Sequence, residues 1–158
     1  MAPFVVVGFG GAPTSDVPLR WAMTEARLRG AELVIVHAYD WDEVGIGVVT
    51  PWGFADGARA LAEAVVAAAV ADARSADPDL RVRGEAVLGR PVDVLAEVSR
   101  GADLVVVGCG THPRWAGRPT PLAHRLLRRA SCPVLITMAP SEEPTASPGR
   151  RLVRPARA

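Results

Sequence analysis

A glycine-rich turn follows the first apolar run of the chain, and it is the first place where the sequence could hold a phosphate. Phe4-Val5-Val6-Val7 leads directly into Gly8-Phe9-Gly10-Gly11. Glycine lets a backbone N–H approach an anion closely. A dinucleotide fingerprint would also need glycine at position 13, where the chain has Pro13, and a Gly-Lys-Ser/Thr loop is excluded because the sequence contains no Lys. The turn alone is therefore weak evidence for a nucleotide site.

Cysteine and histidine suggest two other kinds of chemistry. Cys109 and His112 have the spacing of a metal-ligand pair, but zinc needs three or four ligands and the remaining His and Cys residues lie far along the chain. We therefore expect no metal site. A thiol at a strand end facing a helix start can act as a redox sensor, so Cys109 carries one alternative function. At the end of another strand, His37 is expected to make a structural hydrogen bond. No Gly-x-Ser-x-Gly turn or Ser-His-Asp arrangement is readable, so we expect no catalytic residues.

Five strands are expected to position these residues. Four short apolar runs are β-branched and do not alternate, which is typical of strands buried on both faces of a parallel sheet. They cover residues 4–7, 33–36, 104–107 and 134–136. The segment Leu80–Leu88 alternates between apolar and polar residues, which favours a sheet edge.

Helical periodicity falls between the strands. The predicted helices cover residues 19–26, 54–75, 92–100 and 122–130. Asp16 is expected to cap the first helix and Gly30 to end it. The second is expected to bury a stripe of Leu61, Val65 and Ala69. The last is expected to bury Leu122, Leu126, Leu127 and Ala130, after a cap at Thr120 and a proline at its first position.

The alternation of strands and helices predicts the fold class. It indicates an α/β domain with an open, doubly wound parallel sheet of five strands and right-handed crossovers. Such sheets bind ligands outside the carboxyl ends of the strands, where the strand order reverses. Gly8 and Gly108 each end a strand, so we expect them to flank that crevice.

Three runs of sequence carry a resemblance to a known family. VVVGFGGAPTSDVPLRWAMTEARLRGAELVIVHAYDW, GRPVDVLAEVSRGADLVVVGCGTH and ASCPVLIT resemble the universal stress protein family over about residues 3–138. The resemblance implies a Rossmann-like domain of the adenine nucleotide alpha hydrolase type, with strand order 3-2-1-4-5. It also implies a homodimer through the last strand, Pro133–Met138, and an exposed edge strand is a template for such pairing.

Nucleotide-binding members of that family resemble Gly-x2-Gly-x9-Gly-Ser/Thr after the fourth strand. Gly108 matches the first glycine, whereas the second falls on Thr111 and the final pair falls on Pro121 and Leu122. The aspartate that contacts adenine in those members falls on Gly10. Pro121 has no N–H for a phosphate and Leu122 has no hydroxyl, so we expect weak ATP binding. The candidate nucleotide-site residues are Gly8, Gly10, Gly108, Thr111, Gly117, Thr120 and Leu122.

Composition sets the remaining expectations. The 158 residues are 49% hydrophobic and 22% charged, with a net charge of +1, which fits one globular domain over residues 1–139. Residues 140–158 are rich in Pro and Arg and are expected to form a disordered tail. No concentrated basic footprint, signal peptide or membrane-length apolar run is present, so we expect no nucleic-acid or membrane partner and a cytoplasmic location.

The predicted function is that of a non-catalytic stress-response binding or signalling module without a required cofactor. One alternative is an ATP- or AMP-binding universal stress protein with at most slow ATP hydrolysis, and another is the redox sensor at Cys109. An unidentified protein partner or small-molecule ligand stays open.

Overall fold

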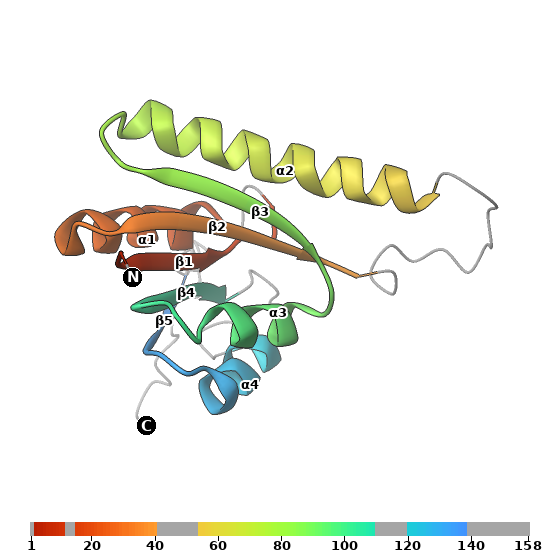
Figure 1. Cartoon of the computed structure of the whole chain (residues 1–158). Coiled ribbons are helices and arrows are strands. Elements are labelled where there is room, and N and C mark those ends of the chain that lie inside the picture. Colours follow the sequence, from red (N-terminus) through yellow and green to blue (C-terminus); the bar gives the residue numbers. More distant parts are fainter. Residues whose placement is uncertain (1, 12–14, 41–53, 110–119, 139–158) are drawn as a thin grey trace, which may run out of the picture.

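The protein forms a five-stranded parallel sheet covered by helices on both faces (Figure 1). The computed structural model describes residues 2–11, 15–40, 54–109 and 120–138. The strand order is β3-β2-β1-β4-β5, as predicted. The elements in chain order are β1 (Phe4–Gly8), α1 (Asp16–Arg29), β2 (Glu32–Tyr39), α2 (Phe54–Ala76), β3 (Val82–Leu88), α3 (Pro91–Val98), β4 (Leu104–Cys109), α4 (Pro121–Arg129) and β5 (Val134–Met138).

Strand β1 lies at the centre of the sheet and separates two cores. It pairs with β2 on one side and β4 on the other. Val5 and Val7 pack into a core with α1 and α2, whereas Val6 packs into a core with α3 and α4. Figure 1 shows the same division, with α1 and α2 on one side of the sheet and α3 and α4 on the other. All three valines are fully buried, which explains why the run shows no polar alternation.

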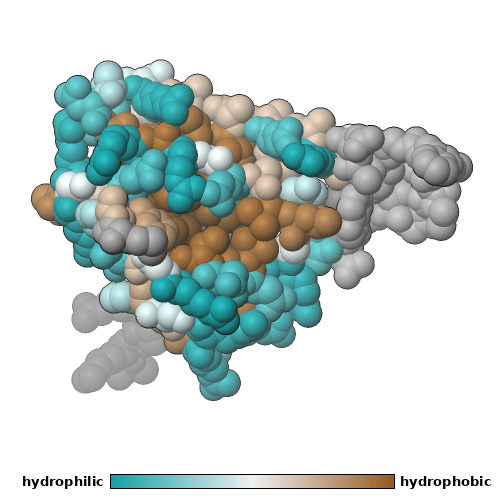
Figure 2. Space-filling model, in the orientation of Figure 1, coloured by the Kyte–Doolittle hydropathy of each residue, from teal (hydrophilic) through white to brown (hydrophobic). Residues whose placement is uncertain are grey.

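The two sheet edges are β3 and β5. The alternating segment forms edge strand β3, as predicted, although the strand begins at Val82 rather than Leu80. Figure 2 shows apolar surface on this side of the molecule, between α2 and α3. Leu88, at the end of β3, is exposed. Within the described ranges, none of the helices is long and apolar enough to cross a membrane.

Helix ends follow local chemistry with one correction. Gly30 ends α1 in the left-handed conformation (φ 61°), as expected. Thr120 caps α4, where its Oγ1 accepts a hydrogen bond from the N–H of Ala123 at 3.3 Å, and Pro121 occupies the first helical position. The N-cap of α1 is Ser15 rather than Asp16, and the Ser15 side chain makes no capping hydrogen bond.

The predicted buried stripe of α2 was right for Ala69, which is buried, and for Val65, which is partly buried against the same core, but it was wrong for Leu61. Leu61 is 68% exposed, and the buried face is made by Ala62, Val66, Ala69 and Ala73. Gly84 in β3 is the point of closest contact with α2, where an added Cβ would lie 2.2 Å from Val66 Cγ1 and 2.8 Å from Val70 Cγ2. The two valines fill the space above the glycine, and Leu61 lies on the exposed face of the helix.

The last helix shows a smaller version of the same error. Leu126 is buried as expected, but Ala123 joins it in the core, while Leu127 is 51% exposed. Leu122 is half-buried.

Gly84→Ala is expected to destabilise the protein by about 1–3 kcal/mol, because the new methyl overlaps two β-branched side chains that have little freedom to move. Gly57→Ala is the matched control. Gly57 lies in α2 with no atom within 4 Å of its added Cβ, so the same substitution should stabilise by about 0.5–1 kcal/mol. Urea unfolding of both variants measures the difference, and equal midpoints would contradict the close contact between α2 and β3.

Candidate functional site

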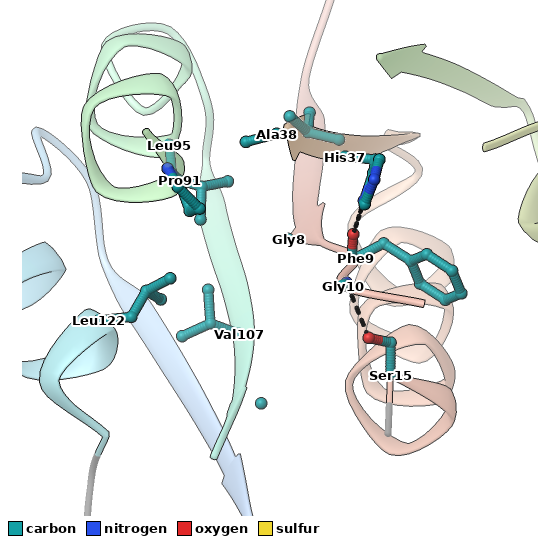
Figure 3. A pocket seen from close by; sticks show the side chains of 12 residues that line it. Gly8, Phe9, Gly10, Ser15, His37, Ala38, Pro91, Leu95, Val107 and Leu122 are labelled. Atoms are coloured by element: carbon teal, nitrogen blue, oxygen red, sulfur yellow. Dashed lines mark hydrogen bonds between the residues drawn. The ribbon is translucent and has the colours of Figure 1, made fainter. Parts of the chain in front are cut away.

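A cavity of about 320 Å³ opens at the carboxyl ends of β1, β2 and β4 (Figure 3). This is the end of the sheet where the strand order reverses, and it is the place expected for a ligand. The volume lies at the lower end of the roughly 300–1,000 Å³ typical of small-molecule sites. The described lining residues are Gly8, Phe9, Gly10, Ser15, Val36, His37, Ala38, Pro91, Leu95, Val107, Gly108 and Leu122.

The cavity brings together four of the seven predicted site residues. Gly8, Gly10, Gly108 and Leu122 line it, although they come from three separate parts of the chain. Thr120 caps α4 and is not among the described lining residues. The other two candidates, Thr111 and Gly117, lie outside the described residues.

The two glycines after β1 have different physical roles. A Cβ at Gly8 would lie 3.0 Å from Leu95 Cδ1 and 3.3 Å from Val107 Cγ1. Gly8 therefore fits closely against the side chains of α3 and β4, and a Cβ there would require Leu95 and Val107 to shift by a few tenths of an ångström. Among the described residues, a Cβ at Gly10 would come within 4 Å of Ser15 Oγ alone, at 3.7 Å, which is an ordinary van der Waals distance, so no described atom crowds this position.

The peptide group between Phe9 and Gly10 is held at both ends. Its carbonyl oxygen, on Phe9, lies 2.7 Å from His37 Nδ1, and its N–H, on Gly10, donates to Ser15 Oγ at 2.9 Å. The N–H of Phe9 continues the sheet pairing by donating to the carbonyl of Val36 at 2.8 Å. Figure 3 shows both side-chain hydrogen bonds on the same wall of the cavity. The structural hydrogen bond expected for His37 is thus confirmed.

Sequence reasoning missed the part played by Ser15. A serine just before a helix suggests a local cap, and only the structure shows that its hydroxyl reaches back to the glycine turn. The apolar wall formed by Pro91, Leu95 and Val107 was also missed, because it comes from α3 and β4 and carries no sequence motif.

Both helices that contribute to the far wall begin with proline. Pro121 and Pro91 occupy the first helical positions of α4 and α3, and neither has an N–H. In α4 the N–H of Ala123 is occupied by Thr120, and that of His124 by the Thr120 carbonyl, which leaves at most the N–H of Leu122 for a ligand. In α3 the first turn also carries Asp93, which pairs with Arg129. The starts of these two helices therefore have fewer backbone N–H donors for an anion than a usual helix N-terminus has.

The described wall is neutral and mostly apolar. Its polar side chains are His37 and Ser15, and no charged side chain belongs to it among the residues described. Over those same ranges, no three His, Cys, Asp or Glu side chains gather as metal ligands, and His112 lies outside them.

Comparison with known proteins shows to which family the chain belongs. A model of the universal stress protein family matches residues 1–137. The chain belongs to the universal stress protein family. The curated relatives it resembles include universal stress protein Rv2623 of Mycobacterium tuberculosis, which is 35% identical over 140 residues and is matched by 84% of this chain. The match covers 46% of that relative, so this universal stress protein chain spans about half the length of the curated relatives it matches.

Solved structures of universal stress proteins share the fold. A universal stress protein in complex with cAMP is 26% identical with a TM-score of 0.64, and the match covers 87% of this chain and 97% of that one. The universal stress protein from Archaeoglobus fulgidus in complex with dAMP is 21% identical with a TM-score of 0.59, over 86% of this chain and 97% of that one. The second comparison supports the fold alone.

The two thiols of this universal stress protein chain differ in surroundings. Cys109, at the end of β4, is 7% exposed. Cys132 is half-buried, and this burial raises the pKa of its thiol. A backbone hydrogen bond with Val105 opposes the increase, and the charge of Asp103 adds a smaller one. A redox sensor needs a thiol that is both accessible and readily ionised. The described surroundings of the two thiols therefore do not favour that alternative.

Cys132 is expected to be the thiol that iodoacetamide modifies in the folded protein. Its rate at pH 7 should be lower than that of free cysteine and should keep rising at pH values where the rate of free cysteine has levelled off, because only the thiolate reacts and the pKa of Cys132 is raised. Cys132→Ser should abolish the native-state reaction, and denaturant should expose both thiols of the unsubstituted chain. Rapid modification of Cys109 in the folded protein would instead support the redox alternative.

Proposed function

We propose that this universal stress protein is a non-catalytic binding and signalling module whose cavity takes a nucleoside or nucleoside monophosphate and holds ATP only weakly. The single observation that carries the proposal is the position of Leu122. Its side chain lines the cavity directly after Pro121, at the start of α4.

The start of α4 argues against a triphosphate seat. A phosphate needs several N–H or hydroxyl donors, and their value comes from their number and alignment. Here Pro121 supplies no N–H, Leu122 supplies an apolar side chain, and the Thr120 hydroxyl, which accepts from Ala123, has a single O–H left to donate and is not among the described residues that line the cavity. A phosphate near Leu122 would lose water without gaining equivalent hydrogen bonds, which is costly for an anion.

The remaining wall suits a flat, largely neutral group. Val36, Ala38, Leu95 and Val107 provide apolar surface, and Gly10 leaves room for close approach. Most small-molecule sites combine such apolar surface with a few polar groups. The structure with bound cAMP, at 26% identity, supports an adenine mononucleotide as the ligand class.

A binding role without catalysis is supported by the same wall. Proton transfer or nucleophilic attack needs a positioned base or nucleophile beside the ligand. Of the two described polar side chains, Ser15 and the Nδ1 atom of His37 hold the Phe9–Gly10 peptide, and no carboxylate or thiol joins them among the described lining residues to act as a partner in proton transfer or as a nucleophile. The proposal therefore assigns no catalytic residue. The titration with Mg-ATP described below would also reveal slow ATP hydrolysis.

The edge at β5 supports a homodimer. β5 pairs with β4 along Val134–Met138 and has no second neighbour among the described strands, so its outer backbone groups are available for another copy. Met138, on that edge strand, is 56% exposed. A second copy would also bring the assembly to about the length of the curated relatives, of which one chain spans about half.

The double variant Pro121→Gly/Leu122→Ser is expected to bind ATP at least tenfold more tightly than the natural chain, because it adds a backbone N–H and a hydroxyl at the start of α4. Isothermal titration calorimetry with Mg-ATP measures the change. The control is Leu127→Ser, which makes the same kind of substitution at an exposed position of the same helix and should leave affinity unchanged.

Two results would contradict the weak-ATP proposal. One is recovery of ATP at about one per chain from the purified natural protein. The other is unchanged ATP affinity in a double variant whose thermal melt shows that it is folded.

Met138→Arg is expected to shift the protein from dimer to monomer, because a charge on an edge strand opposes pairing with a second edge. Sedimentation velocity measures the oligomeric state. Leu28→Arg places the same charge at a residue of α1 that is 76% exposed, and it should leave the dimer intact. A natural chain that sediments as a monomer, or an M138R variant that stays dimeric, would remove the β5 interface.

A further inference from the structure

The hydrogen bond to Phe9 selects one tautomer of the neutral His37 ring. A carbonyl oxygen can only accept, so the proton of this bond belongs to Nδ1. In the neutral ring, the second nitrogen, Nε2, then carries a lone pair and no proton. The bond that fixes the glycine turn therefore also turns His37 into an acceptor on its other side.

The Nε2 atom of His37 is accessible to solvent. Nε2 has no hydrogen-bond partner among the described residues. No buried side-chain nitrogen or oxygen in the described part of the chain lacks a partner, so an unpartnered Nε2 must reach solvent-accessible space. His37 is half-buried and lines the cavity, on the wall shown with Phe9 and Gly10 in Figure 3.

The geometry points to His37 as a specificity-determining residue, whose Nε2 accepts a hydrogen bond from an N–H or O–H group of the bound ligand. This inference rests on the proposed function, since it assigns the polar contact of the same cavity. The neighbouring wall is formed by Val36, Ala38 and backbone, so a ligand without a matching donor leaves Nε2 without a partner in apolar surroundings.

The group that meets Nε2 must be a hydrogen-bond donor, and an adenine nucleoside has such donors on two of its parts. An adenine nucleoside carries donors on the amino group of the base and on the hydroxyls of the ribose. Sites that hydrogen-bond a ligand group reject analogues that lack it far better than apolar pockets reject analogues of the wrong size. Analogues with one donor deleted therefore identify which group meets Nε2.

The experiment is a calorimetric titration of the full chain with AMP, purine riboside 5′-monophosphate and 2′,3′-dideoxy-AMP. The second ligand lacks the amino group and the third lacks both ribose hydroxyls. The natural chain is expected to bind AMP about tenfold more tightly than one of these two analogues, and the weaker analogue names the donor. Equal affinity for all three would overturn the inference without any variant being needed.

Two substitutions of His37 separate its two nitrogens. His37→Asn places an amide N–H near the position of Nδ1, which preserves the bond to Phe9 but removes the acceptor. It should keep the thermal midpoint of the natural chain, bind AMP about tenfold more weakly and lose the discrimination between analogues. His37→Gln reaches toward the position of Nε2 but gives up the bond to Phe9, so it should melt at a lower temperature while keeping part of the discrimination.

The outcomes distinguish this inference from the proposed function. Nucleotide binding with undiminished discrimination in the folded H37N variant would overturn the role of Nε2 and leave the proposed function standing. Failure of the natural chain to bind any of the three nucleotides would overturn both.

Discussion

The double-sided burial of β1 is the constraint on which the rest of the structure depends. Val5, Val6 and Val7 have no exposed surface, and they divide their contacts between the two helical layers. The backbone N–H and C=O groups of a buried strand need hydrogen-bond partners along both of its edges. For β1 these partners are provided by β2 and β4. The chain leaves β1 toward α1 on one face and enters β4 from α3 on the other. The cavity opens where those two directions separate, at Gly8 and Gly108.

The turn after β1 forms part of the cavity wall. Burial ends at Phe9, whose side chain packs into the core with α1 and α2, and Gly10 is exposed. The Phe9–Gly10 peptide is fixed by hydrogen bonds to β2 and to the start of α1. Its position is therefore determined by the sheet and by one helix together, which is the kind of support that a precise binding wall requires.

Most of the fold could be predicted from sequence because strands buried on both faces leave an unambiguous pattern. Phe4–Val7 and Leu104–Val107 are short, β-branched and not interrupted by polar residues, and glycine or proline marks most element ends. The orientation of α2 could not be predicted in the same way. It depends on the space above Gly84, and that space is set by the pairing of β3 with β2, which no local pattern of α2 contains.

The candidate site was predictable in part for the same reason. Gly8, Gly108 and Leu122 could be placed because each follows from a strand end, a helix start or the family resemblance. Ser15 and Leu95 could not, since their contribution arises from contacts across the fold: Ser15 reaches a backbone N–H five residues earlier, and Leu95 fills the space that Gly8 leaves.

The prolines at the starts of α3 and α4 affect how the affinity for a ligand would depend on ionic strength. An anion site built from aligned backbone amides and cationic side chains attracts its ligand electrostatically, and salt screens that attraction. The described wall holds no charged side chain, and two helix starts that face it lack their first amide donor. The proposed recognition by this described wall would depend on shape and on uncharged hydrogen bonds, so its strength is expected to change little with the ionic strength of the surroundings.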